Sequence, residues 1–60
     1  MRLRLEIDLD KLAGERAEEL GRILRYWGSN MADKYLEPGF AQDLYDSTYA
    51  EPVGQLTVQD

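Results

Sequence analysis

The sequence contains neither cysteine nor histidine, and these two absences exclude several kinds of chemistry. Without cysteine there can be no disulfide framework, a composition somewhat more typical of cytoplasmic proteins. Without histidine, the chain lacks both the commonest metal ligand and the commonest general base near neutral pH. We therefore expect no metal site, no cofactor and no enzymatic activity.

The chain also lacks long apolar runs and phosphate-binding loops. No apolar stretch approaches the roughly 18 residues that a membrane-spanning helix needs, so we expect no membrane partner. Gly14 and Gly21 are not followed by the lysine-serine or lysine-threonine pair that marks a phosphate loop. We therefore expect neither a membrane-spanning helix nor a phosphate-binding loop in this chain.

Pairs of carboxylates are the remaining candidates for acid–base catalysis or for a magnesium site. They occur at Asp8 and Asp10, at Glu18 and Glu19, and at Asp43 and Asp46. Either role needs a concave, partly desolvated pocket, and a domain of 60 residues has little room for one. We interpret these acids as solvated surface groups that keep the protein soluble.

Basic residues are few, and the net charge is -5. Such a field repels a phosphate backbone unless the positive charges are concentrated on one face. They are instead spread along the chain, at Arg2, Arg4, Lys11, Arg16, Arg22, Arg25 and Lys34. Direct binding of nucleic acid is therefore disfavoured, and the same interspersed basic residues argue against an acidic mimic of DNA.

The clearest pattern in the chain is an alternation at its start. Leu3, Leu5, Ile7 and Leu9 alternate with charged residues. A period of two is typical of a strand with one buried face. We predict a strand over residues 2–8.

A helical period follows. Apolar residues recur at intervals of three and four, at Ala17, Leu20, Ile23, Leu24, Trp27, Met31 and Tyr35. Asp10 or Gly14 is the expected N-terminal cap, and Glu18 with Arg22 is an expected ion pair one turn apart. Gly28 weakens the pattern, but the apolar stripe stays in phase beyond it, so we predict one helix over residues 14–35.

The last third of the chain is typical of a β-hairpin. Leu56 and Val58 alternate in a closing strand over residues 53–58, and Pro52 is tolerated at the first position of a strand. A shorter strand is expected between residues 41 and 49. If Leu44 faces inward in this strand, Asp46 must do so as well.

The order strand, helix, strand, strand predicts an α+β fold in a single domain, residues 1–60. We expect one helix packed on a three-stranded antiparallel sheet, with the closing strand beside the first. The predicted core is Leu3, Leu5, Ile7, Leu20, Ile23, Leu24, Trp27, Met31, Leu56 and Val58. This core is thin for a chain without disulfides or metals, so we also expect self-association, most simply as a homodimer.

Apolar residues outside this core are candidates for an interaction surface: Tyr26, Met31, Tyr35, Leu36, Phe40, Tyr45 and Tyr49. Trp27 could be a binding anchor, but its position on the stripe favours the core. In one register the last two tyrosines share the open sheet face with Arg2 and Arg4. Aromatic rings beside arginines could stack nucleic-acid bases or form a protein interface, and the negative charge favours the protein interface.

Three segments together resemble a known group of proteins. They are Leu3 to Asp8, Glu19 to Arg25, and Asp46 followed by Val53-Gly54. The chain is similar to short proteins of unassigned activity encoded by actinobacteriophages and, as prophage genes, by actinobacterial genomes. That group usually has an Asn-Gly-type turn before Val-Gly, where this chain has residues 48–52.

The resemblance carries over no activity and no functional residue. It implies a small phage-derived protein in the cytoplasm of a bacterial host, and small phage accessory proteins commonly act by binding a host protein. We therefore expect a non-enzymatic interaction module that binds or modulates a host cytoplasmic protein. The alternative is a regulator linked to nucleic acid, either as a weak binder or as an acidic DNA mimic.

Overall fold

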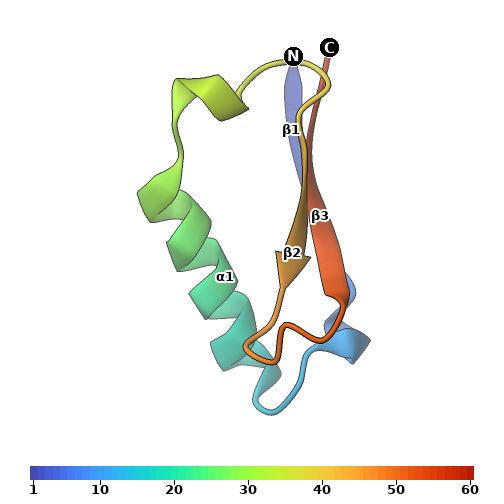
Figure 1. The fold of residues 1–60 in the computed structure, drawn as a ribbon. Helices are drawn as coiled ribbons and strands as arrows, with labels where there is room; N and C mark the ends of the chain where they lie inside the picture. Colours follow the sequence, from blue (N-terminus) through green and yellow to red (C-terminus); the bar gives the residue numbers. More distant parts are fainter.

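One helix and three strands follow one another along the chain in the order that the sequence predicts (Figure 1). The computed structural model describes all residues, 1–60. Its elements are β1 (Arg2–Ile7), the short 3-10 helix η1 (Leu9–Lys11), α1 (Arg16–Asn30), a second 3-10 helix η2 (Asp33–Tyr35), β2 (Ala41–Tyr45) and β3 (Pro52–Gln59). The predicted α+β architecture is confirmed. No helix combines the length and the apolar character needed to cross a membrane.

The three strands form one antiparallel sheet in the order β1-β3-β2. The closing strand therefore lies beside the first, as predicted, and also occupies the centre. Leu5 lies opposite Leu56, and Leu44 lies opposite Gly54. Helix α1 lies along one face of the sheet, and the two chain ends lie together at one end of the molecule (Figure 1).

The helix is shorter than the sequence predicts. It begins at Arg16, with Glu15 at the cap position instead of Asp10 or Gly14, and it ends at Asn30. The prediction of one helix over residues 14–35 is therefore wrong. The poor helix formers Gly28, Ser29 and Asn30 end it, and the Asn30 side-chain amide donates to the carbonyl of Tyr26 (2.7 Å). Tyr35, the last residue of the predicted stripe, lies in a separate turn, η2.

The buried core consists of Leu12, Ile23, Leu44, Val53, Leu56 and Val58. Leu5, Ile7, Leu20, Trp27 and Phe40 pack around it and remain partly exposed. Leu44 on β2 and Leu56 on β3 are the most deeply buried residues, each 1% exposed. The centre of the core therefore lies between α1 and the β2–β3 pair.

Three residues of the predicted core are exposed. Leu3 and Leu24 keep 47% of their surface in contact with solvent, and Met31 keeps 37%. A single helix covers only part of one sheet face, so apolar residues at its flank, beyond its end and on the edge strand stay uncovered. The burial of Leu3, Leu24 and Met31 was predicted wrongly for this reason.

Candidate functional site

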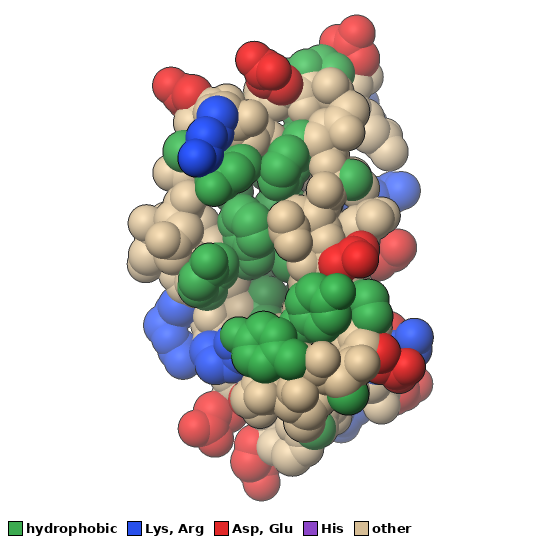
Figure 2. Space-filling view, in the orientation of Figure 1, with side chains coloured by type: hydrophobic (Ala, Val, Ile, Leu, Met, Phe, Trp, Pro, Cys, Tyr) green, Lys and Arg blue, Asp and Glu red, His purple; other side chains and the backbone are tan.

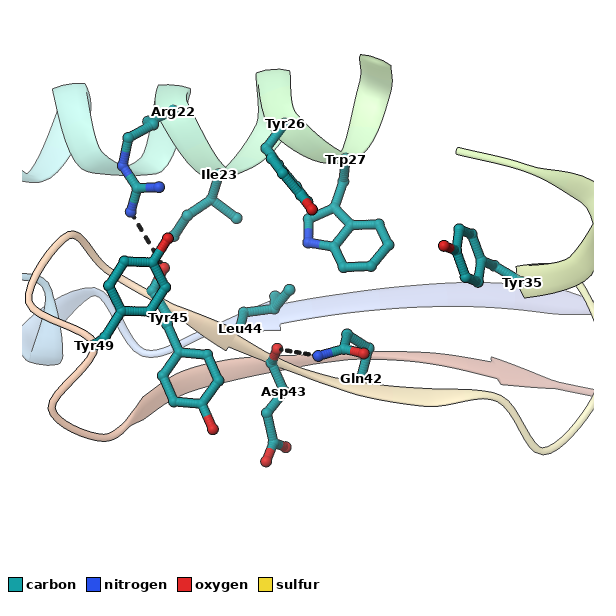
Figure 3. A pocket seen from close by; sticks show the side chains of 10 residues that line it. All are labelled: Arg22, Ile23, Tyr26, Trp27, Tyr35, Gln42, Asp43, Leu44, Tyr45 and Tyr49. Carbon is teal, nitrogen blue, oxygen red and sulfur yellow. Dashed lines mark hydrogen bonds between the residues drawn. The ribbon is translucent and has the colours of Figure 1, made fainter. Parts of the chain in front are cut away.

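A surface hollow of about 310 Å³ lies between α1 and β2. Figure 2 shows a band of apolar side chains along it, flanked by charged residues. The lining residues are Arg22, Ile23, Tyr26, Trp27, Tyr35, Gln42, Asp43, Leu44, Tyr45 and Tyr49 (Figure 3). Five of these ten are aromatic, and we call this hollow the aromatic groove.

Ring-to-ring contacts hold the helix side of the groove. Trp27 meets Tyr26 edge to face at 5.6 Å between ring centres, and meets Tyr35 in the same way at 5.8 Å. Tyr35 in turn packs against Phe40 at 5.2 Å. Such pairs contribute about 0.5–1.5 kcal/mol each beyond the area they bury. Trp27 is therefore half-buried: it packs against the core and also forms part of the groove wall. Both roles that the sequence suggested for it, core residue and binding anchor, remain compatible with this position.

The other end of the groove is formed by Tyr49. Its ring stacks on Tyr45 at 6.0 Å, and its hydroxyl points towards α1 while the Tyr45 ring points away from the helix (Figure 3). Tyr49 is 68% exposed and has a φ of 53°, in the left-handed region. Residues other than glycine lose about 1–2 kcal/mol in this conformation. A large exposed ring thus stands where glycine would fit without strain.

A polar cluster fixes the loop that carries Tyr49. Glu19 Oε1 accepts a hydrogen bond from the backbone N–H of Ser47 (2.7 Å), and Arg22 Nη2 donates to the carbonyl of Tyr45 (3.2 Å). The same arginine lies 3.5 Å from Glu19, which replaces the expected pair with Glu18. The bond from Ser47, followed by the charge of Arg22, lowers the pKa of Glu19.

Asp46 fixes the same loop from the other side and is only 3% exposed. Its Oδ1 accepts from the Thr48 backbone N–H (3.0 Å) and from the Thr48 hydroxyl (2.5 Å), and its Oδ2 accepts from Ala13 N–H (3.1 Å). These bonds, led by the Thr48 hydroxyl, lower the pKa of Asp46. The sequence left the register of this strand open; in the structure Leu44 is buried, and Asp46 is buried with it. Both carboxylates accept hydrogen bonds from backbone N–H groups of distant segments, so their role here is to hold the loop.

Four of the seven residues expected at an interaction surface line the groove, namely Tyr26, Tyr35, Tyr45 and Tyr49. Met31, Leu36 and Phe40 do not line it, and the last of these packs against the core. The sequence placed Ile23 in the core but left the orientation of Leu44 open, so it did not identify these two residues as the buried floor of the groove. The only sequence signal for this floor was that α1 and β2 each carry an apolar residue that could face the other element.

The arginines of β1 lie away from the tyrosines. Arg4 is level with Thr57 and Ala41 in the sheet, whereas Tyr45 lies four residues further along β2, or about 13 Å. Between these levels, Glu6 and Asp43 lie on either side of Gln55 on the same sheet face. The register therefore does not assemble arginines and aromatic rings into a base-stacking surface.

The groove presents aromatic faces beside the polar side chains of Arg22, Gln42 and Asp43, an arrangement suited to apolar side chains of another molecule that are flanked by hydrogen-bonding groups. No group of three or more potential metal-ligating side chains comes together in the fold. Comparison of the chain with family models, with curated proteins and with solved structures gave no match in any of the three.

Proposed function

We propose that this chain is a non-enzymatic protein-interaction module that holds an apolar segment of a host protein in the aromatic groove. The observation that carries the proposal is the exposed ring of Tyr49 in a left-handed backbone conformation. Local strain at an exposed aromatic residue is typical of sites where the side chain serves a function other than stability. Tyrosine and tryptophan are also the residues that contribute most at protein interfaces.

The groove suits insertion of one or two side chains. Its rings are already held by their mutual contacts, so little side-chain entropy is lost when a partner binds. Backbone pairing with β2 is disfavoured, because the carbonyls of Asp43 and Tyr45 already accept hydrogen bonds from side chains. We therefore expect an occupant that offers aliphatic or aromatic side chains.

The proposed setting is the cytoplasm of an actinobacterial host, which rests on the resemblance to the phage-encoded group. The net charge of -5 and the separation of Arg4 from Tyr45 favour a protein partner over nucleic acid. Modulation of the host protein would follow from occupying the surface that the groove binds.

The test is parallel capture from an actinobacterial lysate with the tagged wild-type chain and with Tyr49→Gly, followed by titration of the purified partner. The single tryptophan, Trp27, lies in the groove and reports binding by its fluorescence. We expect Tyr49→Gly and Tyr26→Ala each to weaken binding by about tenfold or more. Leu9→Ala removes an exposed apolar side chain outside the groove and should bind as the wild type does.

Equal affinity of all four chains for the purified partner would overturn the proposal. Failure of the lysate to yield any protein that binds the purified wild-type chain would also count against it. Binding to single-stranded DNA or RNA that depends on Arg2 and Arg4 would support the alternative function instead.

A further inference from the structure

The outer edge of β1 carries unpaired backbone groups. The N–H of Asp8 donates to the carbonyl of Val53 (2.8 Å), in the same register that pairs β1 with β3. Backbone direction alternates along an antiparallel strand, so Arg2, Arg4 and Glu6 also direct their N–H and C=O groups towards β3. The corresponding groups of the odd-numbered residues, Leu3 to Ile7, therefore face outward.

The opposite edge of the sheet is protected. On β2, the Asp43 carbonyl accepts from Gln42 Nε2 (3.0 Å) and the Tyr45 carbonyl accepts from Arg22 Nη2 (3.2 Å), as Figure 3 shows. Because these carbonyls are occupied, they are poor acceptors for an added strand. A register shift between Leu44 and Tyr45 further disrupts that edge, and such irregularities commonly prevent edge strands from pairing with other chains.

Strand β1 has none of these protections. It is regular over six residues and contains no proline, glycine or lysine. Its side chains that face α1 are all apolar, and Leu3 among them is 47% exposed. On α1, Leu24 is equally exposed and lies on the helix flank opposite Tyr26, which is the flank towards β1. Unpaired backbone and uncovered apolar surface thus coincide at one edge.

We propose that β1 pairs in antiparallel fashion with β1 of a second copy of this chain, about a twofold axis that passes through Leu5. In this register Leu5 exchanges backbone hydrogen bonds with its own counterpart, and Leu3 lies opposite the partner's Ile7. On the other face Arg4 lies opposite the partner's Glu6, and Arg2 lies opposite the partner's Asp8.

Charge selects this register. Matching the apolar faces of the two strands allows a twofold axis at any residue from Leu3 to Ile7. An axis at Leu3 places Arg2 opposite the partner's Arg4, and an axis at Ile7 places Glu6 opposite the partner's Asp8, and both are like-charge pairs. An axis at Arg4 places two arginines opposite each other, and an axis at Glu6 places two glutamates opposite each other, both of which are destabilising. The axis at Leu5 alone pairs every charge of the strand with its opposite.

The resulting dimer has a continuous six-stranded sheet with both helices on one face. Leu3 is covered by the partner's Ile7, and the exposed flank that carries Leu24 faces the partner's helix. The two aromatic grooves lie at the outer strands, away from the dimer contact. The interface therefore differs from the tyrosine-rich one expected from the sequence, and it leaves both grooves open.

The test is a charge-exchange experiment followed by sedimentation equilibrium and native mass spectrometry. Arg4→Glu places a second carboxylate opposite the partner's Glu6, and Glu6→Arg places a second guanidinium opposite the partner's Arg4. Each variant alone should therefore dimerise about tenfold more weakly or worse. Within one chain Arg4 and Glu6 face the neutral Thr57 and Gln55, so the fold itself should tolerate both changes.

An equal mixture of the two variants restores both opposite-charge pairs and should form a heterodimer. Arg25→Glu and Glu37→Arg make the same charge changes elsewhere in the chain and should dimerise as the wild type does. A variant mixture that does not associate would overturn the proposal.

Hydrogen exchange distinguishes this interface from any other. The amides of Leu3, Leu5 and Ile7 should be protected in the wild-type dimer and should exchange rapidly in the Arg4→Glu chain. A wild-type chain that stays monomeric at all concentrations, or a dimer in which these three amides remain unprotected, would be equally decisive against the proposal. None of these outcomes depends on whether the aromatic groove binds a partner.

Discussion

The carboxylate of Asp46 accepts a hydrogen bond from the backbone N–H of Ala13, a residue 33 positions earlier in the chain. The bond joins the loop after β2 to the segment that leads into α1, at the end of the molecule opposite the chain termini (Figure 1). Glu19 makes a second connection of the same kind through Ser47. Together they hold the loop that carries Tyr49, and with it one end of the aromatic groove.

The hydrogen bonds accepted by Asp46 and Glu19 predict that the stability of the fold is sensitive to acid. The pKa values of Asp46 and Glu19 are both lowered in the folded chain, so each carboxylate stabilises the fold at pH values above its pKa in the unfolded chain. Stability should be level near neutral pH and should fall as the pH drops below about 4 and through the lowered pKa values. Chemical unfolding at a series of pH values measures the effect.

The matched variant for acid sensitivity is Asp46→Asn. An amide can accept fewer of these hydrogen bonds and directs N–H groups at neighbouring donors, so stability at neutral pH should fall. The loss on acidification should be smaller than in the wild type. An unchanged pH profile in this variant would show that Asp46 is not one of the groups responsible.

Leu44→Ala should destabilise the fold by about 2–5 kcal/mol, because the side chain is 1% exposed at the centre of the core. Leu9→Ala is the matched control, since Leu9 is 46% exposed, and it should cost less than about 1 kcal/mol. Urea unfolding of both variants gives the two values. Similar costs for the two substitutions would mean that the core lies elsewhere.

Two glycine substitutions should act in opposite directions. A β-carbon at Gly54 would collide with the carbonyl oxygen of Glu6, so Gly54→Ala should cost roughly 1–3 kcal/mol through displacement of β1. Gly28, within α1, has no heavy atom near its missing β-carbon, and Gly28→Ala should stabilise by about 0.5–1 kcal/mol. Thermal unfolding, with both proteins at one concentration, tests the pair. A stable Gly54→Ala chain would contradict the close approach of the two strands.

Tyr49→Gly should leave the free energy of unfolding within about 1 kcal/mol of the wild-type value. Relief of the left-handed strain offsets the lost stacking on Tyr45 and the greater flexibility of glycine. Tyr49→Ala keeps the strain while removing the ring, so it should be the less stable of the two. The reverse order in urea unfolding would argue against strain at this position.

The sequence determined by itself the identity and order of the long helix and the three strands. Alternation from Leu3 to Ile7 specified β1, and the apolar recurrence through Leu20, Ile23 and Trp27 specified α1. These patterns are local, because a strand with one buried face and a helix with one buried stripe each repeat within a few residues. The same alternation linked Asp46 to the face of Leu44, but the structure was needed to show that this face is the buried one.

Only the tertiary structure decided which apolar residues are buried. Leu3 and Leu24 fit their stripes as well as Leu5 and Ile23 do, yet they remain exposed. Burial depends on how much of the sheet one helix covers and on where the chain leaves that helix. Both depend on how the helix and the strands are placed relative to one another, and the repeat pattern within a single helix or strand carries no information about that placement.

The groove was likewise decided by the tertiary structure. Tyr26 and Tyr49 come from α1 and from the loop before β3, and they line one groove because Glu19 and Asp46 fix that loop against the start of the helix. The sequence placed the tyrosines outside the core but offered no means of bringing them together. Hydrogen bonds between distant segments set that position, and their partners become identifiable only when the chain is folded.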